Sequence, residues 1–149
     1  MRGTASIRMA MPWRFCSVAA AALLAACVTS TSRYFTPTEG DARLTQDDFR
    51  DESDQLLRVE CPRLMGSTGQ ASGQARIRLL IDRSGAAQRA QFTRSSGDER
   101  IDTIWGALAA RLKFDAQAQQ RSDLAPFMVT VGYSCSANGT AVTTLQLPT

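Results

Sequence analysis

The chain has 149 residues, enough for one domain of ordinary size, and 44% of them are hydrophobic while 21% are charged. This balance is typical of a folded globular domain and not of a disordered chain. The net charge is only +3, and the one lysine and the scattered arginines lack the clustering with aromatics that nucleic-acid binding requires. We therefore expect no nucleic-acid partner.

Residues 1–26 have the order of a secretory signal. Three arginines and no acid precede a run of twelve small or apolar residues, Phe15 to Ala26, and the run stops at Cys27. Counted to Val28, the apolar stretch has fourteen residues, short of the ~20 that span a bilayer. The alternatives are an ordinary signal peptide with a coincidental cysteine and an uncleaved anchor.

The end of this run, Leu24-Ala25-Ala26-Cys27, resembles the lipobox of bacterial lipoproteins. The resemblance implies cleavage before Cys27 and lipidation of that cysteine, which anchors the protein in a membrane. Two or three acyl chains give effectively permanent anchoring. Inner-membrane lipoproteins commonly carry Asp after the cysteine, and because Val28 stands there we expect the periplasmic face of the outer membrane.

The remaining cysteines predict a disulfide. Cys16 leaves with the signal and Cys27 carries lipid, so Cys61 and Cys135 remain in an oxidising compartment. A bridge between them would stabilise the fold by about 4 kcal/mol through chain entropy. The alternative is two separate buried thiols. The chain has no histidine, so zinc and Cys–His catalysis are poorly supported, and we expect no metal and no cofactor.

The stretch 27–60 is expected to be the lipidated cysteine followed by an acidic tether. Residues 28–43 are polar and rich in turn formers, which indicates flexibility. From Leu44 to Glu60 an acidic helix is possible, with Thr45 as its N-cap and Asp48 three positions later. Its apolar points are Phe49, Leu56, Leu57 and Val59. We place the folded domain at 61–149.

Two strands and a hairpin open this domain. Gly66 to Gln74 is glycine-rich but lacks the GK[ST] ending of a phosphate loop, so we expect an ordinary loop. Ala75 to Asp82 alternates with period two, which predicts a strand. Its inward residues are Ile77, Leu79 and Ile81, and Arg76 and Arg78 lie on the other face. A turn at Gly85 leads to a second strand with Ala87, Ala90 and Phe92 as core points.

A helix and a further strand follow. Ser96 to Glu99 has the form of a capping box, and apolar residues then recur at helical spacing. These residues are Ile101, Ile104, Trp105, Leu108 and Leu112. Pro126 to Cys135 alternates again, and Asn138-Gly139 predicts a type I′ hairpin into a last strand at Thr140 to Leu147. The fold class is α+β: a small antiparallel sheet packed on one helix, in the order β-β-α-β with a possible additional C-terminal strand.

The segment from Cys61 to Cys135 resembles the C-terminal domain of TonB-family proteins. The likeness rests on the strand end Ile81-Asp82, on Phe92-Thr93-Arg94-Ser95-Ser96-Gly97, on Ile101-Asp102 and on Leu112-Lys113-Phe114. The resemblance implies a sheet against a helix that grips a partner by strand addition at an exposed edge. A transducer of that family also has an inner-membrane helix and a long proline-rich spacer, which this sequence lacks.

We therefore expect a non-enzymatic adaptor that binds an envelope protein or peptide. The candidate contacts lie in Val129 to Tyr133 and in Thr140 to Leu147, with Val129, Val131, Tyr133 and Val142 as the side chains of the binding edge. Three alternatives stand beside it: an energy transducer that keeps residues 1–26 as an anchor, an envelope enzyme, and a stable module whose edge is sealed by its own C-terminal strand. Oligomeric state is not predicted. Ser95 and Ser96 have no histidine base, and helix capping accounts for Asp98, Glu99 and Asp102, which argues against the enzyme.

Overall fold

The computed structural model describes residues 33–115 and 125–148. Their elements follow the order β1 (Tyr34–Phe35), α1 (Gln46–Met65), β2 (Gln70–Ile81), β3 (Ala87–Arg94), α2 (Glu99–Ala109), β4 (Ala125–Ser136) and β5 (Ala141–Gln146). No helix within these ranges is both long and apolar enough to span a bilayer.

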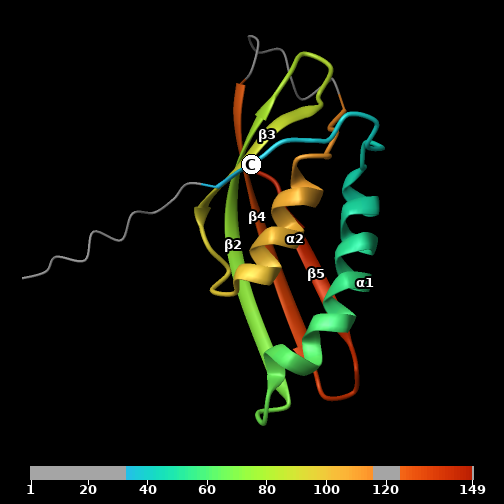
Figure 1. Ribbon diagram of the computed structural model, residues 1–149, viewed down its shortest axis with the longest axis vertical. Coiled ribbons are helices and arrows are strands. Elements are labelled where there is room, and N and C mark those ends of the chain that lie inside the picture. The colour runs from blue at the N-terminus through green and yellow to red at the C-terminus, as the bar shows by residue number, and fades with distance from the viewer. Residues whose placement is uncertain (1–32, 116–124, 149) are drawn as a thin grey trace, which may run out of the picture. The chain divides into compact units, whose positions relative to one another are not determined.

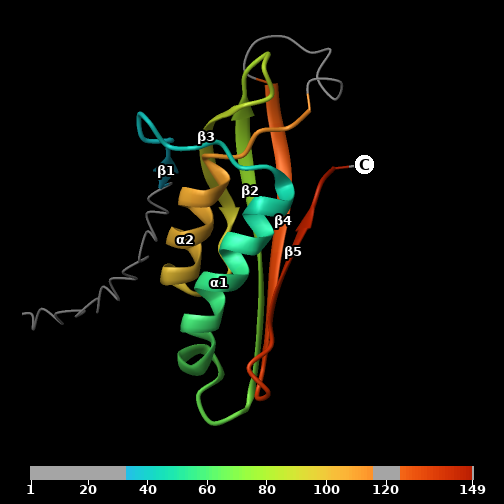
Figure 2. The same cartoon turned by 90° about the vertical axis from the view of Figure 1, so that its right-hand side faces the viewer.

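The strands form one antiparallel sheet in the order β1-β3-β2-β4-β5. Figures 1 and 2 show both helices on the same face of this sheet, so the opposite face is left open. The predicted α+β class, the antiparallel sheet and the additional C-terminal strand are confirmed. The helical layer differs from the prediction because it contains two helices instead of one.

The helix that the prediction did not place in the folded domain is α1. It begins after Thr45, the N-cap expected from the sequence. The Thr45 hydroxyl accepts from the Asp48 N–H at 3.1 Å, and the Asp48 carboxylate accepts from the Thr45 N–H at 3.0 Å, which completes a capping box. The buried residues recur every fourth position, at Phe49, Ser53, Leu57 and Cys61. Leu56 and Val59, two of the predicted apolar points, are exposed at 41% and 76%.

Part of the predicted tether belongs to the sheet. Tyr34 and Phe35 pair with Gln91 and Ala90 of β3. The Phe35 ring lies against Gly106 of α2, where a Cβ would come within 2.4 Å of the ring. Packing therefore holds this short strand, and the domain boundary expected at residue 61 falls inside α1.

Of the stretch expected to be a glycine-rich loop, residues 66–69 form a turn as predicted, and the part from Gln70 onward is the start of β2. Gly73 pairs with Tyr133 of β4, and a Cβ at Gly73 would lie 2.5 Å from the tyrosine ring. Gly73 therefore lets β2 pack closely against Tyr133. A glycine in the sequence looks the same whether it serves close packing in a strand or a turn in a loop. β2 consequently starts at Gln70, five residues before the predicted strand.

Two local details differ from the predictions. Asp98, and not Ser96, is the N-cap of α2, and its carboxylate accepts from the N–H groups of Arg100 and Ile101 at 3.1 Å each. The predicted final hairpin is present, but its loop has three residues, 137–139, because the Ser136 N–H bonds to the carbonyl of Thr140. Gly139 takes the positive φ of 82° that such a loop requires.

The core lies between the two helices and the covered face of the sheet. Its largest fully buried side chains are Trp105, Phe49, Leu57, Ile77, Leu79, Ile101, Leu112, Val129 and Val131. Every predicted inward residue of the first hairpin strand, Ile77, Leu79 and Ile81, is among the buried residues. The core is thus closed on one side of the sheet only, by α1 and α2.

Candidate functional site

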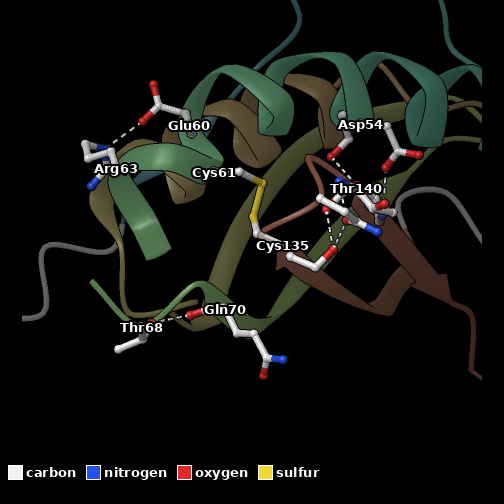
Figure 3. The surroundings of a disulfide bond; sticks show 12 residues. Asp54, Glu60, Cys61, Arg63, Thr68, Gln70, Cys135 and Thr140 are labelled. Atoms are coloured by element: carbon white, nitrogen blue, oxygen red, sulfur yellow. Dashed lines mark hydrogen bonds and ion pairs between the residues drawn. A yellow bond between two sulfur atoms is a disulfide. The ribbon is translucent and has the colours of Figure 1, made fainter. Parts of the chain in front are cut away.

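The predicted lipidation site, Cys27, and the predicted signal, residues 1–26, lie outside the described residues. The predicted disulfide is confirmed: Cys61 and Cys135 are bonded, with Cα atoms 5.6 Å apart. Figure 3 shows that the bridge joins the last turns of α1 to β4. Both cysteines are buried, so the bridge clamps the helical layer to the sheet.

The predicted binding edge requires correction, because β4 is an interior strand. It pairs with β2 along its whole length and with β5 from Thr130 to Cys135. Val129, Val131 and Tyr133 point into the core and are at most 9% exposed. Burial also raises the pKa of the Tyr133 hydroxyl. These three side chains stabilise the domain and cannot contact a partner.

The edge strand on this side of the sheet is β5, which carries the fourth predicted residue, Val142. Its side chain is 43% exposed. Alternation along β5 turns Ala141, Thr143 and Leu145 toward the helices and Val142 toward the open face. Val142 is therefore the one member of the predicted set that a partner can reach.

Two side chains of α1 bond outward backbone groups of β5. The Thr143 N–H donates to the Asp54 carboxylate at 2.6 Å, and the Arg50 guanidinium donates to the Leu145 carbonyl at 3.5 Å. Natural sheets often cover an edge in this way to prevent unwanted pairing. The C-terminal strand thus covers half of β4 and is in turn covered by α1.

One stretch of the same edge is uncovered. β5 reaches only as far as Thr130, so the outer side of residues 125–129 of β4 has no strand partner among the described residues. The even-numbered residues of β4 face β5, since the Ser136 N–H bonds to Thr140 and the Thr143 N–H points away from β4. Backbone alternation then directs the N–H and C=O of Met128, and the C=O of Pro126, outward.

A hollow adjoins this stretch on the open face. Its lining residues are Arg76, Met128, Thr130, Gln146, Leu147 and Pro148. Met128 and Leu147 are exposed at 38% and 36%. The uncovered stretch, which we call the β4 notch and define as residues 125–129, therefore combines unpaired backbone groups with a partly apolar recess beside them.

The hydroxyl and carboxylate groups near α2 serve the fold. Ser95 donates to Asp102 at 2.5 Å, and the Ser96 N–H donates to the same carboxylate at 2.9 Å. Asp98 accepts two bonds from Arg63, at 2.8 and 2.9 Å, in addition to capping the helix. The hydrogen bonds of Arg63 are the largest cause of the lowered pKa of Asp98. Asp98 and Asp102 thus accept hydrogen bonds that hold the fold together. Glu99 forms an ion pair with Arg33 at the surface.

No group of three or more His, Cys, Asp or Glu side chains within residues 33–115 and 125–148 is placed to hold a metal ion. Comparison with known proteins finds no matching family model, no matching curated protein and no matching solved structure. The site is therefore argued from its geometry.

The sequence analysis placed the binding contacts in Val129 to Tyr133 and Thr140 to Leu147, and it missed both the β4 notch and the contacts of α1 with β5. Pro126 is the one local signal of the notch, because proline within a strand is typical of an unpaired edge. The sequence around Asp54 and Arg50 gives no such signal, because both are polar residues typical of the solvent-exposed side of a helix. Their contact with β5 depends on the strand order of the sheet.

Proposed function

We propose that this protein is a lipoprotein of the outer membrane whose α+β domain acts on the periplasmic side as a non-enzymatic adaptor. Cys27 carries the lipid, and the domain binds a protein or peptide of the cell envelope. The domain resembles the C-terminal domain of the TonB family in sequence, and strand addition is the mode of binding that this resemblance implies.

The observation that carries the proposal is the β4 notch. A peptide strand laid beside residues 125–129 would extend the sheet past the end of β5 and meet the outward N–H and C=O of Met128. On β5 the Thr143 N–H and the Leu145 carbonyl are already bonded to Asp54 and Arg50, so an incoming strand meets fewer occupied groups at the notch. Met128 and Leu147 supply apolar contacts for its side chains.

The reach of the anchor supports an adaptor that works close to the membrane. Tyr34 is held in the sheet, so only seven residue steps separate Cys27 from the fold. Fully extended, they cover at most about 25 Å. An energy transducer, the alternative function, needs a spacer that crosses the periplasm, and a link of this length favours the adaptor.

The proposal is tested by photo-crosslinking in living cells. A photoreactive amino acid at Leu147, beside the notch, is expected to give a discrete adduct, whereas the same residue at Val59 on the outer face of α1 is not. Val59 is 76% exposed and serves as the positional control.

A backbone substitution makes the test specific for strand addition. Met128→Pro removes an outward N–H without removing a bond to β2, so it is expected to abolish the Leu147 adduct while the domain stays folded. Met128→Leu keeps the N–H and is expected to preserve the adduct. Equal adducts in Met128→Pro and Met128→Leu would refute strand addition at the notch.

A further inference from the structure

The open face of the sheet gathers arginines that are scattered in the sequence. Arg76 and Arg78 of β2 and Arg89 and Arg94 of β3 are all exposed, and the two arginines of β2 alternate with buried residues. Figure 2 shows that neither helix covers this face. The register places Arg76 directly opposite Arg94, and it places Arg89 opposite Leu80, next to Arg78. Four cations therefore share one surface, which we call the arginine face.

None of these four guanidinium groups has an ion-pair partner among the described residues. Several arginines on the helical side do have one: Arg63 pairs with Glu60 and Asp98, and Arg111 pairs with Glu52. The facing cations Arg76 and Arg94 repel each other, and like charges directly opposite in a sheet are destabilising. A bound anion would relieve the repulsion between Arg76 and Arg94.

Acidic residues are confined to the other side of the molecule and to loops. The five strands contain no Asp or Glu, whereas α1 carries six and α2 carries two. These eight are Asp47, Asp48, Asp51, Glu52, Asp54, Glu60, Glu99 and Asp102. The charge of the domain is thus segregated, with a basic sheet face and an acidic helical layer.

The chain enters the fold at the arginine face. The Tyr34 ring lies under the Arg89 guanidinium, 5.0 Å from the ring centroid to Cζ. Tyr34 and Leu80 add amphipathic and apolar side chains to the face, a combination that suits the boundary between water and lipid headgroups. Because Cys27 is seven residues before Tyr34, an anchored chain holds Tyr34, at one end of this face, within about 25 Å of the bilayer.

We propose that the arginine face docks on the anionic phospholipid headgroups of the membrane that holds the protein. This inference rests on the proposed lipid anchor for its geometry. Docking would orient the domain with the sheet toward the bilayer and the acidic helices away from it. Arginine donates bidentate, charge-assisted hydrogen bonds to phosphate, and an anionic surface attracts each nearby arginine.

The test uses the chain from Val28 onward, which contains the whole core and the disulfide. Its binding is measured to vesicles of equal parts phosphatidylglycerol and phosphatidylcholine, and to vesicles of phosphatidylcholine alone. We expect binding to the anionic vesicles only, and release by salt. The double variant R76Q/R78Q is expected to bind roughly tenfold or more weakly. R58Q/R100Q removes the same charge from the helical side and is expected to bind as the native chain does.

Three outcomes would overturn the proposal. They are no binding to anionic vesicles, an equal loss in both double variants, and binding to polyglutamate or duplex DNA without binding to vesicles. The chain in this assay carries no acyl group, so its result does not depend on whether Cys27 is lipidated. Failure of the anchor is detected separately, by the mass of the protein isolated from cells.

Discussion

At the scale of single residues, a buried hydroxyl links three elements of the fold. Ser53 of α1 is fully buried, and its oxygen accepts from the Trp105 indole N–H at 2.9 Å and from the Thr143 hydroxyl at 2.8 Å. Ser53→Ala leaves both donors without that acceptor in the core. We expect the free energy of unfolding to fall by about 1–3 kcal/mol, measured by urea denaturation of the oxidised protein.

The matched control is Ser134→Ala, which removes an exposed hydroxyl from the open face. It is expected to change the free energy of unfolding by less than about 0.5 kcal/mol. Equal effects of the two substitutions would show that the Ser53 hydroxyl makes no special contribution.

The Arg63–Asp98 pair predicts a pH dependence. Asparagine caps helices as well as aspartate does, so Asp98→Asn removes the charge and keeps the cap. Because the folded pKa of Asp98 is lowered, the pair stabilises the fold above the ordinary carboxyl pKa of about 4 and is lost as pH falls through the folded pKa.

We therefore expect Asp98→Asn to be less stable than the native chain by about 1 kcal/mol at neutral pH. The difference should shrink below about pH 4, where the native carboxylate becomes protonated. Thermal denaturation across that range measures it. A difference that stays constant with pH would contradict the assignment of the stabilisation to the ion pair.

At the scale of elements, α1 protects the β5 edge through Asp54. Asp54→Ala leaves the Thr143 N–H without its acceptor and opens the edge to pairing between chains. We expect the variant to unfold about 1–3 kcal/mol more readily and to form dimers or larger species in size-exclusion chromatography. Asp51→Ala, an exposed acid on the same helix, is the control and should remain like the native chain. Identical elution of the two variants would contradict the protective role.

At the scale of the whole molecule, the disulfide clamps the helical layer to the sheet. The bridge spans 74 residues of sequence, so chain entropy predicts that it contributes about 4 kcal/mol. Replacing both cysteines by alanine should lower the free energy of unfolding by that order, as measured by denaturation without reductant. Reducing agent should then destabilise the native chain and leave the alanine variant unchanged. Sensitivity of that variant to reductant would contradict this account.

Local sequence pattern predicted the elements whose burial follows a simple period. Ile77, Leu79 and Ile81 alternate as a half-buried strand should, and Ile101 and Trp105 follow helical spacing to full burial. The disulfide was predictable because only Cys61 and Cys135 remain once the N-terminal segment is set aside.

The remaining features depend on tertiary context. The inward stripe of α1 includes Ser53, which reads as solvated until Trp105 and Thr143 are seen to bond it. Gly73 reads as loop because its packing partner, Tyr133, is sixty residues away. The strand order places β4 inside the sheet, and no local pattern encodes that order, so three of the four predicted binding residues, Val129, Val131 and Tyr133, proved to be core.

The central claim is that Cys27 anchors a disulfide-clamped domain beside the membrane. The most direct measurement is the intact mass of the protein extracted from bacterial membranes under non-reducing conditions. The account predicts a chain that begins at Cys27, carries the mass of a diacylglycerol and an acyl group, and lacks the two hydrogens of one disulfide. An unprocessed chain that keeps residues 1–26 would contradict it and favour the transducer.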